Sequence, residues 1–184
     1  MKGLVFTEFF EMVEDNLAPE LVDQMIENAN LPSNGAYTSV GNYDYREMVE
    51  LVSQLSTLTD VPVPELLRTF GKHLFGRFAT LYPQFFEGID TTFDALESVD
   101  GHIHVEVRKL YPNADFPSLE CNRPEPGRMV LLYRSERPFA DFAEGLIIGC
   151  AKHFEEKIDI QQEYLSNGER KVVRFTLTQN ENDQ

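Results

Sequence analysis

Hydrophobic side chains in the first two-thirds of the chain recur every three or four residues, which is the spacing of one face of an α-helix. Met48, Leu51 and Leu55 illustrate this spacing. The pattern predicts five helices: one around residues 6–13, one that opens at Pro19 and ends before a polar loop at 30–41, and three more over about 45–58, 64–82 and 92–111. Pro112 closes the last of them, because proline cannot continue a helix.

The last third of the chain changes to shorter hydrophobic runs. These predict a strand at 129–133, a helix at about 140–154, and two strands at 158–164 and 172–178 joined by a turn at Ser166-Asn167-Gly168. Helices followed by antiparallel strands indicate an α+β domain. The chain has neither a βαβ alternation nor a glycine-rich phosphate loop, so a nucleotide-binding fold is not supported.

Composition narrows the class of protein. The 184 residues, 42% of them hydrophobic, are enough for one domain with its own core. A formal net charge of −15, with 16 scattered basic residues, argues against nucleic acid or an anionic membrane surface as a partner. Glu8 and Glu11 break the N-terminal apolar stretch, so we expect neither a signal peptide nor a membrane span. Cys121 and Cys150 do not suggest a disulfide scaffold, which favours a cytoplasmic protein.

The candidate metal ligands are the four histidines His73, His102, His104 and His153. Zinc needs three or four converging ligands, and no Cys/His cluster here has that spacing, whereas a heme needs only one ligand from the protein. On the predicted helix His102 shares its face with polar residues, which favours His104 modestly. Asp100 lies one turn before His104 and would strengthen the imidazole as a donor if it reached the ring; it would otherwise be a solvated surface group.

Tyr133, Ser135 and Arg137 alternate along the predicted strand and its extension. A period of two places all three side chains on one face. Together they offer a phenol, a hydroxyl and a guanidinium, a set that can satisfy two carboxylates. The alternative is an ordinary polar face of a sheet near a turn.

A histidine helix followed by this strand resembles the heme-nitric oxide/oxygen binding (H-NOX) family. The resemblance covers nearly the whole chain and rests on four landmarks in order: Met1-Lys2-Gly3, Ile103-His104-x-Glu106-Val107 with Leu110-Tyr111, Tyr133-x-Ser135-x-Arg137, and Ala143-Glu144-Gly145-Leu146. It implies one heme-binding domain, with a helical N-terminal part over about 1–62 and a heme-holding C-terminal part over about 63–184. It implies heme b, with His104 as the axial iron ligand and Tyr133, Ser135 and Arg137 around the heme propionates.

The resemblance also implies the walls of the heme pocket. Pro117 matches the family's proline that presses on the porphyrin, although a proline here could also simply stiffen a loop. Phe142 stands where some oxygen-binding members have a tyrosine that donates a hydrogen bond to the gas, and Leu74 stands where a relative has a polar partner for that tyrosine. The expected pocket is apolar and consists of residues that would be core residues in any case: Val5, Phe9, Leu74, Phe78, Phe142 and Leu146.

These features predict a nitric oxide sensor rather than an enzyme, since no nucleophile–base pair is evident. In the family, nitric oxide weakens or breaks the bond between iron and the histidine, and the helical part then shifts. Without an output region in the sequence, we expect signalling in trans to a sensor histidine kinase or a cyclic-di-GMP enzyme. The alternatives are an oxygen or redox sensor on the same heme scaffold, and a heme-free domain that binds an apolar ligand or another protein.

Overall fold

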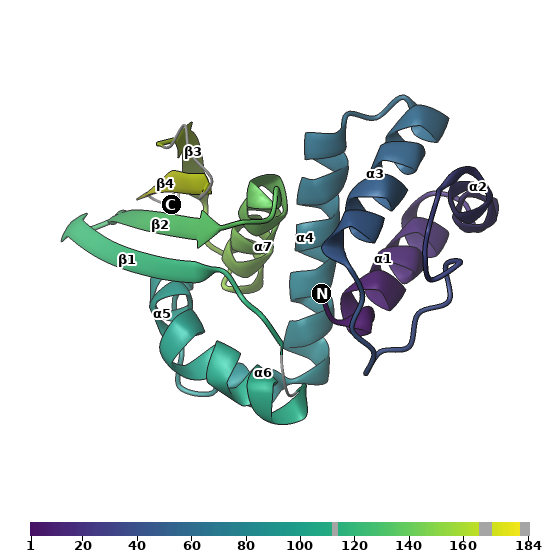
Figure 1. Cartoon of the computed structure of the whole chain (residues 1–184). Helices are drawn as coiled ribbons and strands as arrows, with labels where there is room; N and C mark the ends of the chain where they lie inside the picture. Colours follow the sequence, from purple (N-terminus) through teal and green to yellow (C-terminus); the bar gives the residue numbers. More distant parts are fainter. Residues whose placement is uncertain (112–113, 166–170, 181–184) are drawn as a thin grey trace.

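Two helices, α4 (Val63–Leu81) and α7 (Ala140–His153), pack along each other at the centre of the molecule (Figure 1). The computed structural model describes residues 1–111, 114–165 and 171–180. Three helices lie on one side of the central pair and a β-sheet lies on the other (Figure 1). The expected α+β class is confirmed. Pro112 and the turn Ser166-Asn167-Gly168 lie outside the described residues.

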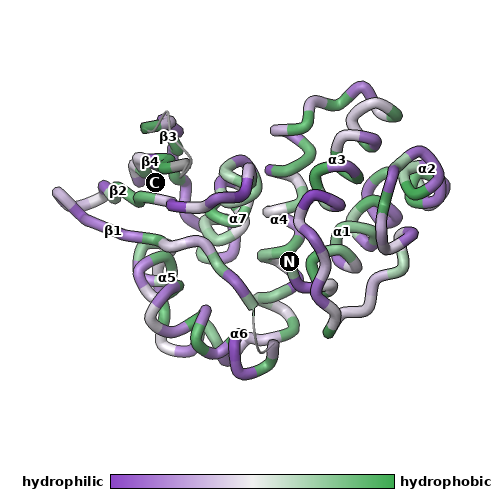
Figure 2. Tube along the Cα trace, in the orientation of Figure 1, coloured by the Kyte–Doolittle hydropathy of each residue, from purple (hydrophilic) through white to green (hydrophobic). Residues whose placement is uncertain are grey.

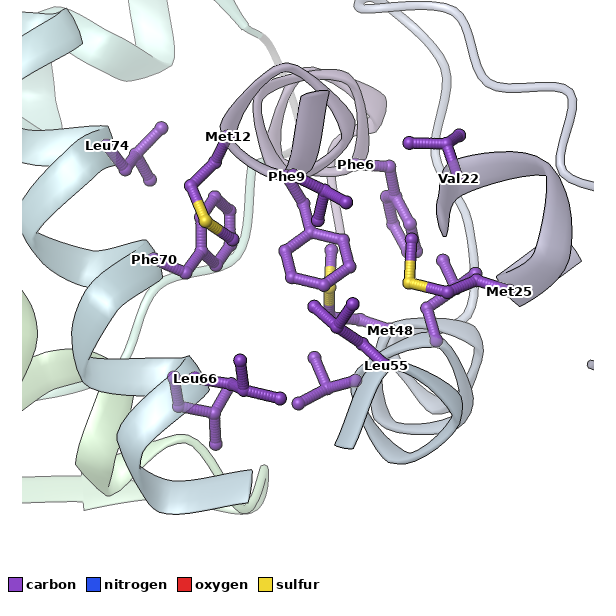
Figure 3. Close-up of a cluster of buried hydrophobic side chains, with 14 of the residues drawn as sticks. Phe6, Phe9, Met12, Val22, Met25, Met48, Leu55, Leu66, Phe70 and Leu74 are labelled. Atoms are coloured by element: carbon purple, nitrogen blue, oxygen red, sulfur yellow. The ribbon is translucent and has the colours of Figure 1, made fainter. Parts of the chain in front are cut away.

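The N-terminal helices α1 (Gly3–Asn16), α2 (Glu20–Asn28) and α3 (Tyr45–Thr59) enclose a hydrophobic core with one face of α4. Phe6 and Phe9 come from α1, Leu55 from α3, and Leu66 and Phe70 from α4 (Figure 3). All are buried, and the three-and-four spacing read from the sequence accounts for each contributing face.

The described strands form an antiparallel four-stranded sheet in the order β1-β2-β4-β3. The strands are β1 (Ser118–Glu125), β2 (Arg128–Ser135), β3 (Ile158–Tyr164) and β4 (Lys171–Gln179). Alternate β2 residues Met129, Leu131 and Tyr133 are buried, and they form a second core with β4, α5 (Thr92–Ser98) and α7. The predicted strands are confirmed, while β1 was not predicted. Figure 2 shows β1 as mostly hydrophilic: only Leu119 and Cys121 alternate with polar residues, a pattern too short to reveal the strand.

The close contact between α4 and α7 depends on glycine. A Cβ atom at Gly71 would lie 2.3 Å from the Phe142 backbone oxygen, and one at Gly145 would lie 2.3 Å from the Arg68 backbone oxygen. No side chain fits at either position, so the helix backbones touch. Arg68 adds ion pairs across the same contact, to Asp141 at 2.7 Å and Glu144 at 2.9 Å.

The prediction of one long α-helix over 92–111 is wrong for the middle of that segment. The chain forms α5 (Thr92–Ser98), then a π-helical turn (Val99–Ile103), then α6 (His104–Leu110). The backbone N–H of His104 donates to the Val99 carbonyl, five residues back. Gly101, at the centre of this turn, lowers helix propensity and helps explain the departure from α-helical geometry.

A short 3-10 helix (Pro83–Phe86) follows α4. Within the ranges described above, no helix is long and apolar enough to cross a membrane.

Candidate functional site

A large cavity lies between the two cores. Its volume is about 940 Å³, near the upper end of the roughly 300–1,000 Å³ typical of small-molecule and cofactor sites. Its walls come from the first residues of the chain, α4, the α5–α6 segment, β2 and α7. The lining is rich in phenylalanine: Phe75, Phe78, Phe85, Phe86, Phe116, Phe139 and Phe142.

His104 lines this cavity at the start of α6, and its side chain is 13% exposed. Its Nδ1 lies 2.9 Å from Oδ1 of Asp100, so the expected acidic neighbour does reach the ring. A carboxylate can only accept, so Nδ1 carries the proton and Nε2 keeps its lone pair. Burial lowers the pKa of His104 below its usual value, against the opposing effect of Asp100. The imidazole is therefore neutral at neutral pH, as a metal ligand must be.

Packing fixes the orientation of the same ring. The Phe116 ring stacks on His104 with a centroid distance of 4.1 Å and an interplanar angle of 15°. The Arg108 guanidinium in turn lies 5.1 Å from the Phe116 ring centroid. His102, by contrast, is exposed and does not line the cavity.

Tyr133, Ser135 and Arg137 all line the cavity. Ser135 Oγ accepts a hydrogen bond from the Arg137 backbone N–H at 3.0 Å, which turns the chain just after β2. The Arg137 guanidinium lies 2.5 Å from the Asp115 carboxylate and 5.7 Å from the Tyr45 ring centroid. Burial raises the pKa of Tyr133, which keeps its phenol protonated and able to donate. This end of the cavity thus offers a cation and two hydroxyl groups.

Five of the six residues expected in the apolar wall line the cavity, and their contact with a heme stays a prediction. Val5, Leu74, Phe78, Phe142 and Leu146 line the cavity.

Phe9 does not line it: this residue is fully buried between helices and packs edge-on against Phe70 at 5.1 Å. The reason is the direction of α1. Its first turn, with Val5, borders the cavity, and the next turn already lies inside the helical core.

Among the described lining residues, the phenols are those of Tyr45, Tyr111 and Tyr133. Tyr45 and Tyr133 lie at the Arg137 end. The Tyr111 hydroxyl is 3.2 Å from the Tyr82 hydroxyl, a hydrogen bond that joins the end of α6 to the end of α4. The side chains at 74, 78, 142 and 146 carry no hydrogen-bond donor.

A family model described as haem-NO-binding matches residues 2–162 of the chain. The chain belongs to this family, also called H-NOX. Members of the family are heme-based gas sensors.

Solved H-NOX structures are similar over almost the full length. The Fe(II) unliganded H-NOX protein from K. algicida is 36% identical, with a TM-score of 0.92 and coverage of 100% of this chain and 99% of that one. The solution structure of the Shewanella woodyi H-NOX, bound to IWP-051 in the Fe(II)CO state, is 42% identical, with a TM-score of 0.81 and coverage of 98% and 95%. An S. oneidensis H-NOX protein in the Fe(II)NO state shares the fold at 24% identity, with a TM-score of 0.85 and coverage of 97% and 99%.

The residues of this H-NOX chain fit a heme. The cavity is large and apolar, one neutral imidazole enters it with a lone pair available, and a guanidinium with two hydroxyls lies at one end. A porphyrin has the matching character, since it is a flat apolar ring with an iron atom and two carboxylates. Within the described ranges, no group of three or more His, Cys, Asp or Glu side chains is placed to bind a metal ion.

Several site residues were missed by sequence reasoning. Phe116 stacks on His104, and Asp115 and Tyr45 contact Arg137. Their identities carry no signal, because single aromatic and acidic residues are common in any sequence. Pro117, which was expected, lines the cavity next to Phe116; its role against a porphyrin stays a prediction.

Proposed function

We propose that this H-NOX domain is a nitric oxide sensor. In this proposal it binds heme b with His104 as the iron ligand and with Tyr133, Ser135 and Arg137 around the propionates. The observation that carries the proposal is the neutral, oriented imidazole of His104 in a cavity whose lining side chains Leu74 and Phe142 offer no hydrogen-bond donor.

Each residue has a distinct task. His104 donates its Nε2 lone pair, and Phe116 keeps the ring from rotating. Arg137 changes its partner when heme binds. Its ion pair with Asp115 is weak because the Asp115 side chain is exposed, so a heme propionate can replace it. The apolar walls exclude water and contribute most of the binding free energy through buried surface.

The bound heme supplies a ferrous iron that takes up diatomic gases. A hydrogen-bond donor in the cavity wall would favour oxygen, whereas nitric oxide would need no such donor. The apolar side chains at 74, 78, 142 and 146 therefore favour nitric oxide.

For signalling, we propose that a change at His104 moves α6 and, through the Tyr111–Tyr82 hydrogen bond, the end of α4. Helix α4 also forms part of the N-terminal core, so a displacement there would move 1–62 against 63–184. The moving surface would regulate a separate sensor histidine kinase or cyclic-di-GMP enzyme. The free thiols of Cys121 and Cys150 suit the proposed cytoplasmic location.

The test is the absorbance of the reconstituted ferrous protein with nitric oxide and with oxygen. We expect a Soret band, a spectral change with nitric oxide, and no stable change with oxygen. A colourless protein would refute heme binding, and a stable oxygen spectrum would favour the oxygen-sensor alternative. The variant His104→Gly should retain heme only with added imidazole. His102→Gly is the matched control, and it should behave like the wild type.

A further inference from the structure

The Asp100 carboxylate joins two separate parts of the site. Its Oδ1 lies 2.9 Å from His104 Nδ1, and its Oδ2 accepts a hydrogen bond of 2.9 Å from the Leu119 backbone N–H. Leu119 is the second residue of β1, so the Asp100 side chain connects the π-helical turn, the His104 ring and the sheet. Both oxygens are therefore used, although the Asp100 side chain is 42% exposed.

Asp100 and His104 are four residues apart, a spacing at which side chains meet on a helix. Both lie in or beside the π-helical turn, in which the His104 N–H donates to the Val99 carbonyl. Such turns cost helix stability and are frequent at functional sites. Among the described residues, Asp100 is the one hydrogen-bond partner of the His104 ring, and its other neighbour, Phe116, contributes only stacking.

We propose that Asp100 is a positioning residue that sets how strongly His104 donates electrons to the iron. This inference rests on the proposed function, because it assumes that His104 is the iron ligand. A carboxylate that accepts the Nδ1 proton fixes the tautomer and increases the basicity of Nε2. The ligand bond is then stronger than that of a histidine whose Nδ1 faces water, and a gas must overcome that bond to release the ring.

Asp100 also limits how the ring can leave. Release of His104 from the iron requires α6 to move, and the bond from Asp100 to Leu119 ties the preceding turn to β1. The Asp100 carboxylate thus both strengthens His104 as an electron donor and holds the π-helical turn to the sheet.

The test uses the His104→Gly protein, with imidazole or 1-methylimidazole as the replacement ligand. Imidazole keeps an N–H for Asp100, and 1-methylimidazole has a methyl group there. We expect imidazole to bind the heme protein about 10- to 100-fold more tightly. Adding Asp100→Asn keeps the size of the side chain and any steric clash but removes the charge, so the preference should fall about five- to tenfold.

Glu106→Gln in the same background is the matched control. Glu106 lies on α6 and pairs with Lys109 at 2.6 Å, so the variant removes a charge near the site without touching the ring. It should leave the preference unchanged. In the protein with His104 intact, Asp100→Asn should lower the frequency of the iron–histidine stretching vibration, and Glu106→Gln should not.

The outcomes separate the two proposals. If neither the wild type nor the imidazole-supplied His104→Gly protein holds heme, the proposed function fails. If both hold heme but Asp100→Asn alters neither the ligand preference nor the vibration, only the role of Asp100 is refuted. A loss of thermal stability without a change in either readout would mean that Asp100 merely anchors β1, and this too would overturn the inference.

Discussion

The strongest quantitative prediction concerns Arg137, whose proposed task is to bind a heme propionate. The variant Arg137→Gln removes the charge and keeps a side chain of similar reach. In the structure the guanidinium pairs with Asp115, whose side chain is 76% exposed. We expect the variant to fold normally, because an exposed ion pair contributes only about 0.2–1 kcal/mol to stability.

The effect on heme retention is larger. A hydrogen bond to a charged group contributes about 1.5–3 kcal/mol. In the wild type, Arg137 must first break its ion pair with Asp115, which reduces this contribution by about 0.5 kcal/mol. The net contribution of Arg137 is then about 1–2.5 kcal/mol, which corresponds to about 5- to 70-fold weaker heme binding in the variant.

The assay is the rate of heme transfer from the ferric protein to an excess of apomyoglobin, followed by absorbance. Arg128→Gln is the matched control: Arg128 also belongs to β2 and pairs with an exposed acid, Glu125 at 3.2 Å, but it does not line the cavity. Asp115→Asn should slow heme loss slightly, because it removes the competing partner of Arg137. Equal rates for Arg137→Gln and Arg128→Gln would show that Arg137 does not contact the heme.

Three further predictions follow from the packing. Phe142→Tyr places a donor in the cavity wall, so oxygen should dissociate about 10- to 150-fold more slowly in stopped-flow absorbance; an unchanged rate contradicts the account of gas selectivity. Phe9→Ala should lower the free energy of unfolding in urea by about 3–5 kcal/mol and leave the heme spectrum unchanged. An altered spectrum would show that Phe9 does contact the heme. Burial lowers the pKa of His73 below the value of 6.5 for an unfolded chain. As the pH falls through 6.5 the unfolded state takes up the proton first, so unfolding free energy should decrease; His73→Gln should show a smaller decrease between pH 7.5 and 5.5, and an equal one would exclude His73.

Much of the fold could be predicted because it depends on local periodicity. The three-and-four spacing of Met48, Leu51 and Leu55 defines a helix face whatever that face packs against. The sequence also singled out His104, Tyr133 and Ser135, which the structure brings to one cavity, since spacing places Tyr133 and Ser135 on one side of a strand.

Only the tertiary structure shows which apolar residues line the cavity and which lie in the core. Val5 and Phe9 lie one helical turn apart and are equally apolar, yet only Val5 borders the cavity, because the direction of α1 relative to α4 decides which turn reaches it. Strand β1 was not predicted because only two of its residues, Leu119 and Cys121, pack against the core, and its pairing with β2 cannot be read from its own sequence. The contact of Asp100 with Leu119 joins residues 19 positions apart. Periodicity shows which residues of a segment form its hydrophobic face. Which segment packs against that face is decided by contacts between parts of the chain that are far apart in sequence.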